Sequence, residues 1–439
     1  MSNRSFSRRD VLIGAGAATL AGLTGCDSAA SSFLSGSTNS AAGVSPLSRM
    51  LPNVVVSQPT GAAIQSAINS IGPGGGTINL TAKTPYIIED ALVIAKNNIK
   101  LVGRGPGSTI LRAKKGAVLS VPGHPEEYLL LIQSSSGISI LDLEIDTVNE
   151  ANISGNQRRG IGAWNSSTVK IRSVGFVDNL GPNAFNQSLS FNQCSSFEID
   201  QCEISRSRTG ISVFKSTSFR ILGCKIQQCE IEAPSFSGPV AAMLIASSSS
   251  GSITSSFVNK NQVSGSIIVK SSSDLAIGSC RISKTLAFSG RPENPGIAIE
   301  DCNLHRVTVD RCSIQQNTGP GIAVNSSTGV TIKENTLAQN GTPGNGGPAI
   351  RMSGTQNVLV TLNHVSDNRG PDYPGIAAGL SSVTDSGGMI TGNAVRGFGS
   401  GVTLGSNSQS FTVEDNDLRS NTQCVVNDGS GNTVENNQC

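Results

Sequence analysis

The chain has 439 residues, of which 14% are charged and 4% are aromatic, and it contains 50 glycines. So few charges exclude a solvated coiled coil, and so few aromatic residues exclude a core built on large rings. The 32 basic and 30 acidic side chains give a net charge of +2, and the two numbers become equal without residues 1–25. Nucleic-acid-binding proteins need a basic footprint, so we expect no nucleic-acid partner.

Residues 1–25 have the pattern of an export signal. Arg8 and Arg9 form a twin-arginine pair, and the apolar run that follows, residues 11–23, is too short to span a bilayer comfortably. The run ends in Leu-Thr-Gly-Cys, which resembles the lipobox of bacterial lipoproteins, with cleavage before Cys26 and lipid on its sulfur. We expect export by the twin-arginine route and attachment to the bacterial cell envelope, at its periplasmic face or at the cell surface, through the lipid alone.

Residues 26–50 are rich in Ser, Ala and Gly and have no hydrophobic period. Such a composition predicts a flexible tether between the lipid and the body of the protein. Residues 51–439 are predicted to form a single domain.

Replacing Cys26 with serine is expected to release the protein into the soluble fraction, because the tether and the body are polar. Fractionation of cells that express the Cys26→Ser variant measures this. A variant that stayed with the membrane would contradict the lipid anchor. Replacing Arg8 and Arg9 with lysine tests the export route in the same cells.

A short helix is predicted next along the chain. Thr60 is a suitable N-cap, and Ile64, Ala67, Ile68 and Ile71 fall on one face at helical spacing. A helix of this kind closes the open end of a stacked-repeat body.

A repeat begins near residue 160. One copy, PGIAVNSSTGVTIKENTLAQN at residues 320–340, has three alternating segments separated by small polar residues. Each copy predicts three β-strands of three to five residues. The small residue that precedes the last strand forms a column with a mean interval near 26 residues: Val174, Cys202, Cys224, Asn261, Cys280, Cys312, Asn335, Asn363, Asn393, Asn416 and Asn436. A second column lies five positions later: Asn179, Cys229, Asn317, Asn340, Asn368 and Asn421.

These columns predict how the coils stack. Equivalent positions of stacked coils lie about 4.8 Å apart, so the Asn amides are expected to hydrogen-bond from coil to coil while the thiols pack as small apolar groups. The pattern resembles the right-handed parallel β-helix of the pectate-lyase-like superfamily, over about residues 55–439. The resemblance implies an all-β solenoid with three short strands per coil, about 11–13 coils and an N-terminal capping helix. Lyases, hydrolases, epimerases and inert scaffolds share this fold, so the fold does not fix the activity.

The cysteines fit the same stack. No Cys-x-x-Cys pair suggests a zinc site, and seven cysteines in or beside the repeat strands are expected to be buried free thiols: Cys194, Cys202, Cys224, Cys229, Cys280, Cys302 and Cys312. Cys424 and Cys439 lie in the last coil, 15 residues apart. A disulfide between them would add about 3 kcal/mol by the chain-entropy model, and two unpaired thiols are the alternative.

Period two along the segment GISVFK directs Ile211 and Val213 inward and Ser212 and Phe214 outward. The same register predicts an outward column, with five coil steps between its first member and Glu300: Trp164, Asn192, Phe214, Lys270, Glu300, Asn325 and Ser353. Neighbouring turns add basic side chains: Arg158, Arg159, Arg206, Arg208 and Lys215. Residues 158–225 carry nine basic and four acidic side chains, a local excess that favours an anionic ligand.

Outward rings beside arginines are typical of a carbohydrate subsite, because rings stack on sugars and guanidinium groups bind carboxylates. We expect a polysaccharide ligand that contains uronate, held by five residues: Trp164, Phe214, Arg159, Lys215 and Glu300. Cleavage by β-elimination would need a cation at the carboxylate, Arg206 or Arg208, and a base, Lys270. The alternative is a non-catalytic surface scaffold for adhesion or assembly, in which Lys270 and Glu300 form an ordinary surface ion pair.

Several motifs of related enzymes are absent. The chain lacks the Asn-Thr-Asp, Asp-Asp and Gly-His-Gly motifs of β-helix polygalacturonases and the Asp-Pro-His-Asp motif of alginate epimerases. Inverting hydrolysis by paired aspartates is therefore not expected. His124, His305 and His364 are scattered along the sequence and are expected to be structural or solvated.

No cofactor and no metal ion are expected. Two runs of alternating carboxylates offer Ca²⁺ as the alternative, if their oxygens converge: Asp142, Glu144 and Asp146, and Glu198, Asp200 and Glu203.

Overall fold

The computed structural model describes residues 51–146, 158–177, 187–230, 240–286, 294–303, 306–341, 347–366 and 373–439. The export signal, the tether and Cys26 lie outside the described residues, as do Asn179, His305, Asn368 and the side chain of Arg158. Within the described ranges, no helix has both the length and the apolar character needed to cross a membrane.

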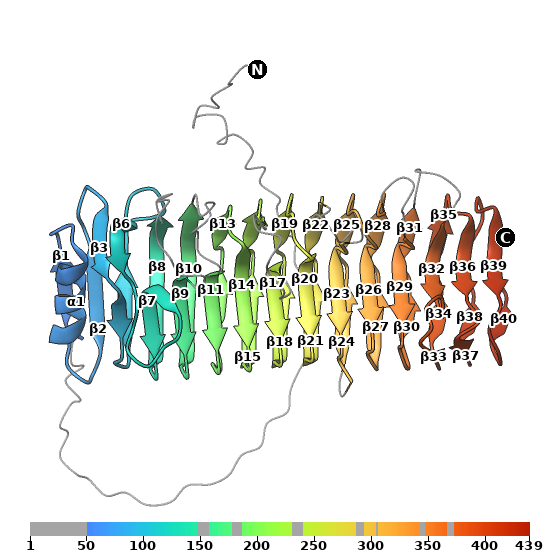
Figure 1. The fold of residues 1–439 in the computed structure, drawn as a ribbon, viewed down its shortest axis with the longest axis horizontal. Coiled ribbons are helices and arrows are strands. Elements are labelled where there is room, and N and C mark those ends of the chain that lie inside the picture. The colour runs from blue at the N-terminus through green and yellow to red at the C-terminus, as the bar shows by residue number, and fades with distance from the viewer. Residues whose placement is uncertain are drawn as a thin grey trace, which may run out of the picture. The chain divides into compact units, whose positions relative to one another are not determined.

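Helix α1 (Gly61–Ser70) closes the N-terminal end of a long solenoid (Figure 1). The hydroxyl of Thr60 accepts a hydrogen bond from the amide of Ala63 at 3.3 Å, so Thr60 is the N-cap as predicted. Ile64 and Ile68 are buried on the face that covers the first coils. The capping helix is therefore confirmed.

The solenoid consists of parallel strands, and most coils contribute three of them. One strand of each coil enters a sheet of thirteen strands, a number within the predicted range of coils. In stacking order these are β4 (Leu92–Ile94), β7 (Glu127–Gln133), β9 (Arg158–Trp164), β11 (Gln187–Asn192), β14 (Thr209–Phe214), β17 (Ala241–Ala246), β20 (Gly265–Lys270), β23 (Ile297–Glu300), β26 (Ile322–Asn325), β29 (Ile350–Ser353), β32 (Pro374–Ala378), β36 (Ser400–Leu404) and β39 (Gln423–Asn427).

The other strands form two ladders, which the long strands β8 (Ser136–Asp146) and β10 (Ser167–Val177) join. The first ladder also contains β1 (Asn53–Val56), β2 (Gly76–Leu80), β5 (Ile99–Val102), β12 (Glu198–Asp200), β15 (Thr217–Leu222), β18 (Ser249–Thr254), β21 (Ser273–Gly278), β24 (Val307–Asp310), β27 (Val330–Lys333), β30 (Leu359–Thr361), β34 (Met389–Thr391), β38 (Thr412–Glu414) and β40 (Thr433–Glu435). The second contains β3 (Tyr86–Asp90), β6 (Ile110–Val118), β13 (Glu203–Ser205), β16 (Lys225–Gln227), β19 (Phe257–Asn259), β22 (Arg281–Ser283), β25 (Ser313–Gln315), β28 (Thr336–Ala338), β31 (His364–Ser366) and β35 (Ala394–Arg396). A small separate pair consists of β33 (Asp385–Ser386) and β37 (Ser408–Gln409).

Inward side chains form one continuous core because period two repeats in register from coil to coil. Ile211 of β14 pairs with Met243 of β17, which pairs with Ile267 of β20, and all three are fully buried. The interior of the solenoid is therefore filled by stacked aliphatic side chains, which leaves chemistry to the outer surface.

The predicted asparagine column is confirmed at its centre. Asn335 is buried, its Oδ1 accepts the amide of Cys312 at 2.8 Å, and its Nδ2 donates to the carbonyl of Val309 at 3.0 Å. Its Nδ2 also donates to Oδ1 of Asn363 on the next coil at 3.0 Å. The side chain of Asn335 thus joins its own coil to the coil before it and to the coil after it.

Two positions of that column were predicted wrongly. Ser256, rather than Asn261, follows Cys224, because the hydroxyl of Ser256 accepts the amide of Cys224 at 3.2 Å. Asn261 belongs to the second column, where it accepts the amide of Cys229 at 2.8 Å. At the end of the chain Asn437, rather than Asn436, accepts the amide of Asn416. At residue 256 serine takes the place of asparagine without changing the fold, so following asparagines alone shifted the alignment there. At residues 436 and 437 two adjacent asparagines allowed a shift of one residue.

The cysteines occupy two kinds of environment. The seven cysteines of the repeat strands are free and buried. Cys424 and Cys439 form a disulfide, with their Cα atoms 5.5 Å apart. This bond joins the start of β39 to the last residue of the chain and closes the final coil.

Candidate functional site

The outer face of the thirteen-stranded sheet contains the predicted outward column. Strand pairing aligns Trp164 with Asn192 and Asn192 with Phe214, and it aligns Lys270 with Glu300. Ala246 lies between Phe214 and Lys270 and was missing from the predicted column. With Ala246 included, five coil steps separate Trp164 from Glu300, as the repeat indicated.

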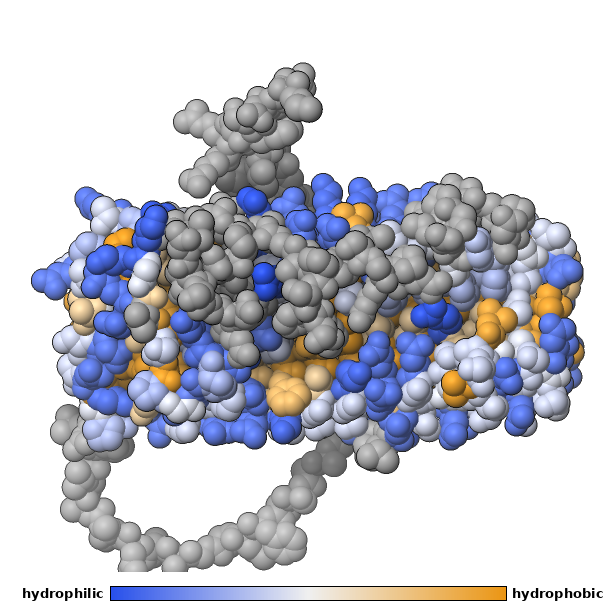
Figure 2. Space-filling model, in the orientation of Figure 1, coloured by the Kyte–Doolittle hydropathy of each residue, from blue (hydrophilic) through white to orange (hydrophobic). Residues whose placement is uncertain are grey.

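The neighbouring outward row is covered rather than solvated. Ser212 has the predicted outward direction but is only 6% exposed, and Ile268 and Ala298 in the same row are 2% exposed. Ile268 and Ala298 pack with Ala241 and Leu244 in an apolar cluster separate from the interior core. Figure 2 shows apolar surface along the middle of the visible face, with hydrophilic side chains along its margins. A polar ligand would therefore find its partners at the margins of this face.

Trp164 lies in the outward column, but other side chains occupy its ring. Its Nε1 donates a hydrogen bond to the hydroxyl of Tyr128 at 2.7 Å. The His124 ring meets the indole edge-on, with 5.1 Å between the ring centroids. The half-buried indole is thus part of an aromatic cluster. The outward column had suggested an open platform for a sugar at this position, and the indole does not provide one.

A buried ion pair lies beside this cluster. Arg159 Nη2 donates to Glu126 Oε1 at 2.8 Å, and the two side chains are only 14% and 10% exposed. Tyr128 donates to Glu126 Oε2 at 2.8 Å, and Arg159 also bonds to the hydroxyl of Ser190. Burial raises the pKa of Tyr128 well above the usual range of a phenol, although the charge of Arg159 opposes this. Arg159 was expected to bind substrate carboxylates, but an internal carboxylate already holds it.

Phe214 and Lys215 lie at the end of β14 as predicted. Phe214 is 38% exposed, and the ammonium of Lys215 lies 5.2 Å from the centroid of its ring. Lys215 itself is exposed. This pair offers a ligand an apolar ring and a cation at the margin of the sheet where β14 ends.

Lys270 lies between two carboxylates. Its Nζ is 3.6 Å from Glu300 Oε2 and 3.6 Å from Asp301 Oδ2. An ammonium with two carboxylates as neighbours has the environment of a surface ion pair. The geometry thus agrees with the alternative of a surface ion pair, which the sequence had left open for Lys270 and Glu300.

Arg206 and Arg208 lie at the opposite end of the strand from Lys270. Both precede β14, whereas Lys270 ends β20, two coils further on. A strand of this length separates its two ends by about 17 Å. The structure therefore does not bring the predicted cation and the predicted base of a β-elimination to one sugar residue.

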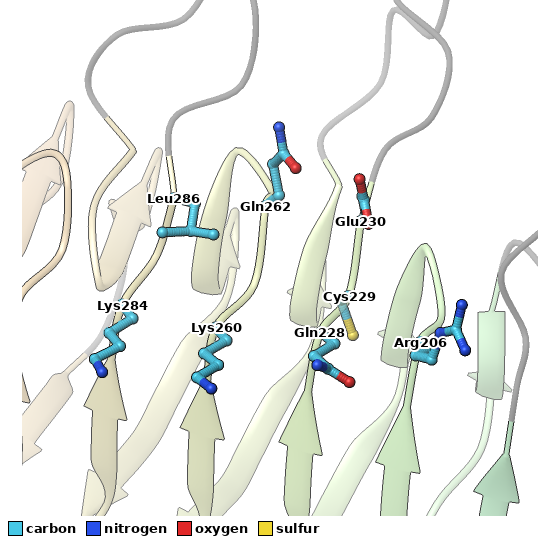
Figure 3. A pocket seen from close by; sticks show the side chains of 8 residues that line it. All are labelled: Arg206, Gln228, Cys229, Glu230, Lys260, Gln262, Lys284 and Leu286. Atoms are coloured by element: carbon cyan, nitrogen blue, oxygen red, sulfur yellow. The ribbon is translucent and has the colours of Figure 1, made fainter. Parts of the chain in front are cut away.

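A hollow of about 560 Å³ adjoins Arg206. Figure 3 shows its lining: Arg206, Gln228, Cys229, Glu230, Lys260, Gln262, Lys284 and Leu286. Lys260 and Lys284 are exposed, and neither makes an ion pair within the part of the chain that the structure describes. The hollow thus combines three cationic side chains with one carboxylate, which favours an anionic ligand.

Sequence reasoning missed Lys260 and Lys284. Each follows the last residue of a short strand, β19 or β22, as Arg206 follows β13. An alignment of FVNK and RISK with EISR would have placed the three cations at one position of the repeat. Counting charge along residues 158–225 missed them, because both lysines lie beyond residue 225. Two of the basic side chains inside that stretch, Lys170 and Lys225, pair with Glu198 and Glu203 at 2.7 and 2.6 Å.

The acidic runs also make ion pairs. Asp146 bonds to Arg112 at 2.7 Å, and Glu198 and Glu203 pair as just described. Among the described residues, no three His, Cys, Asp or Glu side chains lie close enough together to hold a metal ion. His364 is exposed on β31.

Comparisons with known proteins agree with the architecture. A family model described as the right-handed β-helix region matches residues 160–346 and 267–439. No curated protein matches the chain significantly.

Solved structures with the same fold are more numerous. The A-module of mannuronan C-5 epimerase AlgE4 from Azotobacter vinelandii is 16% identical, with a TM-score of 0.55, and the match covers 87% of this chain and 97% of the module. DFA-IIIase from Arthrobacter chlorophenolicus A6, in complex with GF2, is 13% identical, with a TM-score of 0.57 and coverages of 88% and 98%. Tailspike protein 3 of bacteriophage CBA120 is 11% identical, with a TM-score of 0.58 and coverages of 86% and 58%. At these identities the likeness concerns the fold alone.

Proposed function

Because this chain belongs to the right-handed β-helix family, we propose that it binds an acidic carbohydrate polymer at the margin of the thirteen-stranded sheet. The observation that carries the proposal is the hollow beside Arg206, where Lys260 and Lys284 have no ion-pair partner among the described residues. An ammonium held near other cations gains free energy when an anion neutralises it. One of the structural neighbours is named as an epimerase of mannuronan, a polymer of acidic sugars. Its name supports an acidic carbohydrate as the class of ligand.

Binding is a better interpretation of this surface than cleavage. Lys270 is paired with Glu300 and Asp301, and it lies at the far end of the strand from Arg206. The cations of the hollow have no buried general base among them, only the half-buried carboxylate of Glu230. We further propose that the protein performs this binding in the cell envelope, held there by the lipid on Cys26 that the sequence indicates.

Titration of the purified protein with uronate oligomers, and with neutral oligomers of the same length, tests the function. We expect the acidic oligomers to bind more tightly at low salt and to lose affinity as salt is added. Replacing both Lys260 and Lys284 with alanine is expected to weaken acidic binding by about tenfold or more, because charge-assisted hydrogen bonds are the stronger ones.

The matched control replaces Lys100 and Lys115, two exposed lysines near the capped end of the solenoid. It makes the same change in net charge and is expected to leave the affinity unchanged. A wild-type protein that bound no acidic oligomer at low salt would support the scaffold alternative instead. Ultraviolet-absorbing unsaturated products in the same samples would reveal cleavage in addition to binding.

A further inference from the structure

One corner of the solenoid has an unusual series of residues. The residue that follows each short strand of the second ladder is in the left-handed backbone region in six successive coils, with φ between 53° and 58°. The six residues are Arg206, Gln228, Lys260, Lys284, Gln316 and Gln339. We call this series the corner row. All six side chains are long, and all end in N–H donors.

The backbone places these residues directly above one another. The amide of Gln228 donates to Asn259, the residue before Lys260, and the amide of Lys260 donates to Ser283, the residue before Lys284. Figure 3 shows the first four side chains following one another along adjacent coils. At about 4.8 Å per coil the corner row is about 24 Å long.

Left-handed backbone favours glycine, and asparagine or aspartate after it, and it is unfavourable for longer side chains. The other corners of the same coils mix short residues, such as Ser255 and Ser279, with long ones, such as Lys215, Arg311 and Glu334. Among the described residues, only the corner row has a long side chain with N–H donors at this conformation in six successive coils. An uninterrupted series of such side chains, each at an unfavourable backbone conformation, indicates a functional demand on the side chains.

We propose that the corner row is a track for a linear acidic glycan that lies parallel to the solenoid axis. The proposal rests on the proposed function and adds to it the position, direction and length of the ligand. Arg206, Lys260 and Lys284 bind the anionic groups. Gln316 and Gln339 bind hydroxyl or ring oxygens further along, and the amide of Gln316 already donates to that of Gln339 at 3.0 Å, which fixes the orientation of both.

A length series of uronate oligomers tests the track. We expect the affinity to rise with oligomer length until the ligand spans the corner row, and then to level off. Replacing both Gln316 and Gln339 with alanine is expected to lower the affinity for long oligomers about threefold to tenfold. Short oligomers, which reach only Lys260 and Lys284, are expected to bind as before.

The matched control replaces Gln193 and Gln201 with alanine. Both are glutamines with a left-handed backbone, at φ 54° and 52°, but they occupy other corners. This variant is expected to bind oligomers of every length like the wild type. A gain-of-function variant, Gln316→Lys with Gln339→Lys, is expected to bind long acidic oligomers more tightly, and lysine already occupies this corner on two coils.

The outcomes separate the two proposals. If no acidic oligomer binds, the proposed function fails. If acidic oligomers bind through Lys260 and Lys284 but neither length nor Gln316 and Gln339 affects the affinity, the track is overturned and the function stands. A lower melting temperature with unchanged affinity in the Gln316→Ala, Gln339→Ala variant would show that the glutamines only support the stack, and would also overturn the track.

Discussion

Replacing Glu126 with glutamine is expected to destabilise the protein by about 3 kcal/mol, because it leaves the buried guanidinium of Arg159 without a counter-charge. The Arg159–Glu126 distance is 2.8 Å, and both side chains are largely removed from water. The hydroxyl of Tyr128 would lose its charged acceptor at the same time. Urea denaturation of the purified variant measures the change in unfolding free energy.

Two further variants show whether the charge is responsible. Replacing Arg159 with methionine in the Glu126→Gln background removes the isolated cation and is expected to recover part of the lost stability. Glu89→Gln breaks the Lys114–Glu89 pair, whose side chains are 54% and 62% exposed, and is expected to cost less than about 1 kcal/mol. Equal losses in Glu126→Gln and Glu89→Gln would contradict the buried-pair interpretation.

Replacing Asn335 with leucine is expected to cost about 1–3 kcal/mol, because the amide of Cys312 and the carbonyl of Val309 lose their hydrogen-bond partner inside the stack. Asn335→Cys is expected to be milder, since Cys312 holds the same position on the preceding coil and its thiol donates to the carbonyl of Asp310. Thermal and urea unfolding of the variants measure both effects.

Asn325 supplies the control for this experiment. It lies in the outward column, half-buried, and Asn325→Leu is expected to change stability by less than about 0.5 kcal/mol. Equal costs at Asn325 and Asn335 would contradict the role of the amide column.

The fold could be predicted because the repeat determines it locally. Each coil reuses one pattern of inward aliphatic residues and one polar column, so the register of Ile211 or Asn335 follows from alignment alone. The error at Asn261 arose because serine at residue 256 fills the position that asparagine fills in other coils. The error at Asn436 is a shift of one residue between two adjacent asparagines.

The site could be predicted only in part. The register placed Trp164 correctly, but Tyr128 and His124, which occupy its ring, come from a segment before the recognisable repeats. Arg159 carried the expected charge, yet only the three-dimensional structure shows that Glu126 neutralises it. Lys260 and Lys284 are separated by 24 positions in the sequence and become neighbours only once the coils are stacked.

The corner row also bears on how such a protein can be altered. Each coil contributes one residue to it, and a coil contacts only the coils beside it. A change at Gln228 or Gln316 therefore alters the side chain at one position of the surface without disturbing the aliphatic interior. Duplicating a coil would extend the surface by one position, about 4.8 Å. The ligand specificity of such a solenoid can therefore be changed one coil at a time while the architecture stays the same.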